Sequence, residues 1–146
     1  MKLIIFIVAA LIAMPALADG RAGPQPMPGQ SWYISNLATE AVQYVGSSKF
    51  TRLPGAWCAD AVSAWLVATG HKPLPNRMAA SALAYGPRSS GQSGDLAVFI
   101  GRRGYAYHVG VVVASLGPDV EVVSGNWNHH VARAILPRRS LIFIRT

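Results

Sequence analysis

The chain has 146 residues, of which 51% are hydrophobic and 13% charged, and it contains a single cysteine. This composition excludes an intrinsically disordered chain, a collagen-like chain and a small domain held together by disulfides. Thirteen lysines and arginines stand against six aspartates and glutamates, which gives a net charge of +7. We therefore expect an anionic partner, although charge alone does not choose between nucleic acid, anionic lipid and cell-wall polymer.

The N-terminus has the pattern of a secretory signal peptide over residues 1–18. Lys2 supplies the positive start, residues 3–11 are apolar, and residues 16–18 (Ala-Leu-Ala) match the small-residue pattern of a signal-peptide cleavage site. Pro15 interrupts the apolar stretch, which is shorter than the roughly 20 residues that span a bilayer. We expect cleavage, export to the periplasm or the extracellular space, and no stable membrane insertion.

The rest of the chain is expected to form one domain behind a short tether. Residues 19–30 are rich in proline and glycine and lack hydrophobic periodicity, so we predict a flexible tether there. Residues 31–146 are long enough for a single folded domain, and no internal repeat or second domain is evident. We expect this domain to be a monomer.

Hydrophobic spacing predicts helices in the first part of this domain. Apolar residues at helical spacing predict a helix that starts near Asn36 and ends at Gly46. A second helix is better marked, because Pro54 and Gly55 precede its start and Gly70 stands where a left-handed C-terminal cap belongs. Its apolar spacing puts Cys58 in the first turn. A third short helix is predicted over residues 78–85. The second helix has apolar or small residues at Cys58, Ala61, Val62, Trp65, Leu66 and Thr69.

After Gly94 the period changes from helical to extended. Turn residues at 101–104, 117–119 and 137–139 are predicted to close hairpins between successive strands. Helices followed by a mainly antiparallel five-stranded sheet indicate the α+β class. The five predicted strands are 95–100, 107–114, 120–124, 131–136 and 141–145.

Cys58 is the first candidate for chemistry. A lone thiol in an exported chain is an inert buried residue, an intermolecular disulfide partner or a nucleophile. The N-terminus of a helix favours thiolate through its unpaired backbone N–H groups and the helix dipole. Lowering a thiol pKa by about two requires roughly 2.7 kcal/mol, whereas the helix terminus supplies roughly 0.3–1 kcal/mol. The rest of this free energy must therefore come from a nearby cation, such as an imidazolium.

Four histidines could supply that imidazole. His71 follows the end of the second predicted helix, where an exposed partner of the helix dipole is the ordinary interpretation. His129 and His130 are neighbours, and in an extended segment their side chains point to opposite faces, so they do not form one metal site. His108 stands at the head of an apolar strand, where a buried polar ring needs a hydrogen-bond partner. It is either a catalytic histidine or a structural one bonded to the backbone.

The segment from Ser124 to Asn128 (Ser-Gly-Asn-Trp-Asn) is the third candidate element. A base imidazole needs a third group to hold its tautomer, and an asparagine oxygen can accept the second ring N–H. We choose Asn126 for this role, with Asn128 in reserve. The alternative interpretation is a plain Gly-Asn turn.

Two tryptophans flank these candidates. Trp57 precedes the cysteine and Trp127 follows the asparagine, so both could wall a substrate cleft together with Asn128. The alternative is that they pack the helix against the sheet. Trp65 belongs to the core by its helical spacing.

The order of these elements resembles the CHAP group of cysteine, histidine-dependent amidohydrolases/peptidases and the related NlpC-type cell-wall peptidases. These are papain-like enzymes that cut peptidoglycan. The resemblance covers roughly residues 35–146, essentially the whole predicted domain. The matching pieces are Trp57-Cys58-Ala59, the strand Gly94-Asp95-Leu96-Ala97-Val98-Phe99, His108-Val109-Gly110 and Val123-Ser124-Gly125-Asn126-Trp127.

The resemblance implies a nucleophile at Cys58, a general base and acid at His108 and an orienting residue at Asn126. It also implies a papain-like fold, with the N-terminal helices packed on the sheet. Many enzymes of this group carry a glutamate where this chain has Ser124, so the support of the dyad would depend on Asn126 alone. Asp60, two residues after the nucleophile, is more simply a charge of the first helical turn.

The expected function is a secreted cysteine hydrolase that cleaves an amide bond in peptidoglycan without a metal or cofactor. Zinc amidases are the nearest enzymatic rival, and they need several histidine and carboxylate ligands around one ion. A cell-wall-binding module that keeps the fold without catalysis is the first alternative. A nucleic-acid-binding protein is the second, although no recognised motif interleaves aromatic residues with the basic ones.

Overall fold

The computed structural model describes residues 36–49 and 51–146. The predicted signal peptide (1–18), the predicted tether (19–30) and the first residues of the predicted domain lie outside the described residues. The elements follow the order α1 (Asn36–Gln43), α2 (Cys58–Ala68), η1 (Ala79–Ala84), β1 (Leu96–Ile100), β2 (Ala106–Leu116), β3 (Asp119–Trp127), β4 (His130–Pro137), η2 (Arg138–Ser140) and β5 (Leu141–Ile144).

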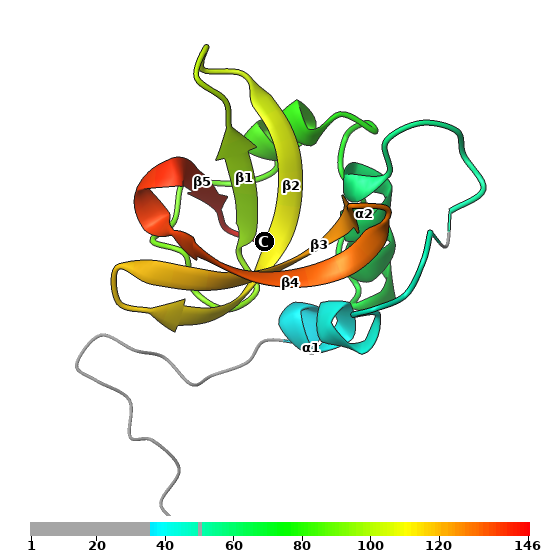
Figure 1. Ribbon diagram of the computed structural model, residues 1–146, viewed down its shortest axis with the longest axis horizontal. Helices are drawn as coiled ribbons and strands as arrows, with labels where there is room; N and C mark the ends of the chain where they lie inside the picture. The colour runs from blue at the N-terminus through cyan, green and yellow to red at the C-terminus, as the bar shows by residue number, and fades with distance from the viewer. Residues whose placement is uncertain (1–35, 50) are drawn as a thin grey trace, which may run out of the picture.

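The strands form one five-stranded sheet in the order β4-β3-β2-β1-β5, and every neighbouring pair is antiparallel. The predicted α+β class and the five predicted strands are confirmed. Figure 1 shows α1 and α2 together at one side of the sheet, near the turn that joins β3 to β4. The helices therefore cover one part of the sheet and leave the β1–β2 hairpin projecting beyond them.

The predicted hairpin at residues 137–139 is wrong. Instead of pairing with β4, β5 crosses to the opposite edge of the sheet and pairs with β1. Arg138 anchors this crossing, because its side chain donates hydrogen bonds to the carbonyl oxygens of Gly117 and Ser90 and to the Ser115 hydroxyl. A local turn signal marks the end of a strand without specifying which strand the chain joins next.

The first two helices form where the sequence predicts them, although α1 ends at Gln43 and residues 44–46, up to the predicted stop, form a turn. The third helix differs in type. α2 starts at Cys58, and Gly70 beyond its C-terminus has a φ of 84°. Residues 79–84 form a 3₁₀ helix, where Ser81 Oγ turns back to the carbonyl oxygen of Met78. Six residues give an α-helix few intrahelical hydrogen bonds, so the tighter turn is favoured. None of the described helices is long and apolar enough to cross a bilayer.

Close packing between α2 and β3 fixes where the helix begins. A Cβ atom on Gly125 would lie 2.6 Å from Ala61 Cβ and 2.7 Å from Trp57 Cζ3. Only a glycine therefore lets the first turns of α2 lie directly on the β3 backbone. Around this contact, Trp65, Leu66 and the strand valines form the larger of two buried clusters, which seats the helix. The start of α2 is thus held against the end of β3.

Candidate functional site

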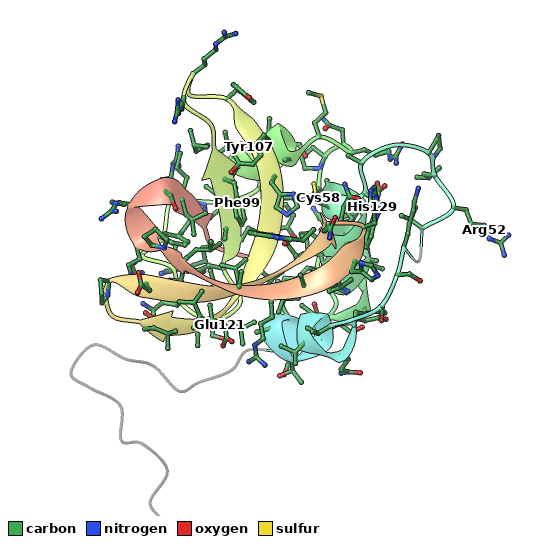
Figure 2. The ribbon with its side chains drawn as sticks, viewed as in Figure 1. Arg52, Cys58, Phe99, Tyr107, Glu121 and His129 are labelled. Carbon is green, nitrogen blue, oxygen red and sulfur yellow. The ribbon has the colours of Figure 1, made fainter. Side chains whose placement is uncertain are left out.

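Cys58 is the first residue of α2; it is a free cysteine, and the residue is 5% exposed. The backbone N–H of Val109, on β2, is directed at the sulfur, as are the N–H groups of Cys58 and Ala59 in the first helical turn. Figure 2 draws Cys58 between the β1–β2 hairpin, marked by Phe99 and Tyr107, and the β3–β4 turn, marked by His129. The thiol therefore faces the β2 backbone immediately after His108.

The pKa of the Cys58 thiol is shifted in the opposite direction from the lowering expected at a helix N-terminus. Burial raises the pKa of the Cys58 thiol above its ordinary value, and this effect exceeds the lowering by the N–H groups of Val109, Ala59 and Cys58. The Asp60 carboxylate raises this pKa further. A buried thiolate loses its hydration, and a few amide dipoles do not replace it. The resting residue is thus a neutral thiol.

Asp60 is engaged in an ion pair of its own. Arg77 Nε and one terminal nitrogen of its guanidinium donate to the two carboxylate oxygens of Asp60 at 2.8 and 2.7 Å. The same terminal nitrogen also donates to the carbonyl oxygen of Pro54 at 2.9 Å. This guanidinium links the segment before α2 to the first turn of the helix. It also counteracts the carboxylate charge near the thiol.

His108 lies on β2 opposite Phe99 of β1. The two rings meet edge to face with centroids 4.9 Å apart, and the Trp127 ring contacts His108 in the same way at 5.7 Å. Burial among these rings lowers the pKa of His108 to about 4. A desolvated imidazole disfavours its charged form. His108 is therefore neutral at physiological pH and available as a proton acceptor.

The polar partner of His108 is Ser124. Its hydroxyl Oγ lies 2.9 Å from His108 Nε2, and the serine is 1% exposed on β3, the strand next to β2. We expected this hydrogen bond from Asn126, so the residue that stands in the glutamate position is the one that meets the ring. Residues 124 and 126 of a regular strand point to the same face, so regular alternation alone did not decide which of the two side chains meets the ring.

Asn126 lies where β3 loses its regularity. The pairing of β3 with β4 shifts between Ser124 and Trp127, and Asn126 adopts a φ of 58° in this bulge. Asparagine tolerates this left-handed conformation better than most residues. The bulge brings Trp127 against the His108 ring. Asn126 thus shapes the site through the backbone and lines its pocket.

A pocket of about 260 Å³ opens beside His108. The sequence identified four of its residues, His108, Asn126, Trp127 and Asn128, and missed the two on the β1–β2 hairpin. The pairing of Phe99 with His108 across the hairpin was the available signal, since directly opposed residues share a face. The pocket is lined by Phe99, Tyr107, His108, Asn126, Trp127 and Asn128.

The remaining predicted candidates lie elsewhere. Trp57 is 2% exposed and packs beside Gly125, so it belongs to the core and does not wall the pocket. His71 Nδ1 is 3.1 Å from the Thr69 hydroxyl on the surface. His130 is exposed, and its Nδ1 contacts the carbonyl oxygen of Asn128. Over residues 36–49 and 51–146, no three histidine, cysteine or acidic residues are grouped as metal ligands.

The imidazole belongs to His108 of β2, and the Cys58 sulfur faces the backbone of the next residue, Val109. In the described part of the chain they share no hydrogen bond, because Nε2 of the ring is bonded to Ser124 and the sulfur faces the Val109 N–H. Both groups rest in their neutral forms. The Nδ1 atom of the ring remains for a proton transfer, and the N–H groups at the start of α2 can stabilise a developing negative charge.

No protein-family model matches the chain, and the comparison with curated proteins finds no match.

Proposed function

We propose that the protein is an exported cysteine hydrolase of papain-like fold that cleaves an amide bond in peptidoglycan. One arrangement carries the proposal: the Cys58 thiol at the N-terminus of α2 faces Val109, and the adjacent His108 ring is bonded to Ser124 at the edge of a pocket. A nucleophile, a neutral base and a group that orients the base are the parts that acyl transfer requires.

The first half of the reaction acylates the enzyme. With Nε2–H donating to Ser124 Oγ, the lone pair of His108 Nδ1 accepts the thiol proton as the sulfur attacks the substrate carbonyl carbon. The carbonyl oxygen takes up the negative charge opposite the N–H groups at the start of α2. The C–N bond then breaks, and the proton on Nδ1 passes to the departing amine.

The second half restores the thiol. Water attacks the thioester while His108 accepts one of its protons, and the C–S bond breaks to release a carboxylic acid. The proton on His108 returns to the sulfur. Because both resting groups are neutral, proton transfer accompanies attack, and no preformed ion pair is required.

Two observations support peptidoglycan as the substrate. The sequence motifs resemble those of cell-wall hydrolases, and the net charge of +7 attracts an anionic polymer. The predicted signal peptide would deliver the protein to the compartment where such a polymer lies.

The test is hydrolysis of purified peptidoglycan under reducing conditions, with mass spectrometry of the released fragments. We expect fragments from the wild type and none from Cys58→Ala or His108→Ala, with both variants still folded by circular dichroism. Wild-type turnover in either variant would refute the catalytic assignment. The released ends identify which amide bond is cut.

A non-catalytic wall-binding module is the second candidate. It is favoured by the raised pKa of Cys58 and the low pKa of His108, which leave no thiolate–imidazolium pair at rest. If wild type and Cys58→Ala both sediment with the wall and neither releases fragments, the binding module replaces the hydrolase.

A further inference from the structure

The pocket beside His108 has the chemistry of a sugar site. We propose that it binds one neutral N-acetylated sugar ring of the glycan strand, so that the amide joining glycan to peptide is the bond presented to Cys58. The placement of the scissile bond rests on the proposed function. The sugar site itself does not need catalysis.

Aromatic rings form most of the pocket wall. Phe99 stands at the centre, with its ring centroid 6.1 Å from that of Tyr107 and 5.8 Å from that of Trp127. Trp127 and Tyr107 remain 37% and 56% exposed, so their surfaces are open to a ligand. Sugar rings carry apolar C–H faces that pack on exposed aromatic rings of this kind, and exposed tyrosine and tryptophan add a polar end.

The polar groups of the pocket are uncharged. Asn126 and Asn128 each offer two donors and a carbonyl acceptor, which suit hydroxyl and acetamido groups. Burial keeps His108 neutral. None of the six described residues that line the pocket is an acid or a charged base. Such a lining offers no ion partner to the carboxylates and amines of a stem peptide, whereas it matches a neutral sugar.

The size of the pocket limits the occupant. About 260 Å³ is below the range of roughly 300–1,000 Å³ for pockets that enclose drug-sized ligands. One ring fits this space better than a disaccharide does. His108 lines this pocket and Cys58 does not. The substituent of the bound ring would therefore have to extend past His108 to bring its amide to the thiol.

The binding test separates the sugar from the peptide. The Cys58→Ala protein is titrated with a neutral N-acetylglucosamine trisaccharide and, separately, with a sugar-free stem peptide, and binding is followed by tryptophan fluorescence and calorimetry. We expect saturable binding of the trisaccharide. Trp127→Ala and Tyr107→Ala should each weaken it by about tenfold or more. The control is Ile135→Ala on β4, which removes a side chain 63% exposed and outside the pocket, and should bind normally.

Each outcome bears on a different part of the proposal. Trisaccharide binding that needs Trp127 supports the sugar site, even if the wild type hydrolyses nothing and the catalytic proposal fails. Binding of the peptide in place of the trisaccharide, lost in Trp127→Ala, overturns the sugar site in favour of a peptide site. Cys58-dependent hydrolysis that is unchanged in Trp127→Ala, with no trisaccharide binding, overturns it while the hydrolase stands. Fragments cut at the sugar–peptide amide support the placement of the bond, and fragments cut only within the peptide overturn it.

Discussion

The Nε2 atom of His108 and the hydroxyl oxygen of Ser124 lie 2.9 Å apart, across neighbouring strands of the sheet. A serine hydroxyl can orient an imidazole, but it carries no charge to stabilise an imidazolium. A carboxylate in the same place would raise the pKa of the ring. Burial lowers the pKa of His108, and the Ser124 hydroxyl adds no charge that would raise it again.

Removing this hydroxyl should slow the proposed hydrolysis without unfolding the protein. In Ser124→Ala the ring loses its orienting hydrogen bond, which is worth roughly 1 kcal/mol or somewhat more. We expect kcat on peptidoglycan to fall by about tenfold. The measurement is the initial rate of fragment release, with thermal unfolding to show that the protein is intact.

Asn126→Ala is the matched comparison for that variant. Asn126 has a φ of 58°, which alanine adopts less readily, so its loss should disturb the bulge that places Trp127. We expect a weaker apparent affinity for substrate together with a moderate loss of rate. If Asn126→Ala changes only kcat and Ser124→Ala changes nothing, Asn126 is the orienting residue that the sequence predicted.

The low pKa of His108 predicts activity in mild acid. The base must be neutral to accept the thiol proton, and with a pKa of about 4 the ring stays neutral well below the ordinary value of 6.5. The acid limb of the kcat/KM profile should therefore fall near pH 4. Ser124→Asp should move this limb upward, because a carboxylate favours the imidazolium. An acid limb near 6.5 in the wild type would contradict the burial of the ring.

The same shift predicts how stability depends on pH. The pKa of His108 is lower in the folded chain than in the unfolded chain, so between pH 6.5 and about 4 only the unfolded chain binds this proton. The free energy of unfolding should fall as the pH falls through this window, by at most roughly 3 kcal/mol from this residue. Urea unfolding of the wild type and of His108→Asn at pH 7 and pH 4 measures this change in the free energy of unfolding. Equal acid losses in the two proteins would contradict the prediction.

The sequence predicted the elements better than their partners. Helical spacing located Cys58 at the start of α2, and alternation located all five strands, because both signals are local. The path of β5 depends on the contacts of Arg138 with residues distant in sequence, which no local pattern reveals. The site shows the same limit. A bulge after Ser124 decides which side chain contacts His108. At Cys58, burial raises the pKa of the thiol more than the N–H groups of the helix N-terminus lower it.

The raised pKa of Cys58 should make its thiol slow to alkylate. At pH 8 we expect iodoacetamide to modify the folded protein at least about tenfold more slowly than the urea-unfolded protein. Asp60 raises this pKa, so Asp60→Asn should speed the reaction. Arg77→Ala leaves the carboxylate without its guanidinium partner and should slow it. Changes in the same direction in both variants would mean that loosening of the segment before α2, rather than charge, controls the thiol.

Gly125 gives the sharpest test of how the fold places the proposed nucleophile, Cys58. In Gly125→Ala the new methyl group would lie within 3 Å of Ala61 and Trp57, so the start of α2 must move away from β3. Overpacking of this kind costs roughly 1–3 kcal/mol of stability. Because the shift carries Cys58 away from β2, we expect kcat to fall more steeply than stability does. Gly91→Ala is the control, since its methyl group would crowd Phe143 and Arg138, residues outside the pocket. It should lower the melting temperature and leave kcat unchanged. A Gly125→Ala variant that is destabilised to the same degree but turns over at the wild-type rate would mean that the contact between α2 and β3 does not set the position of the thiol.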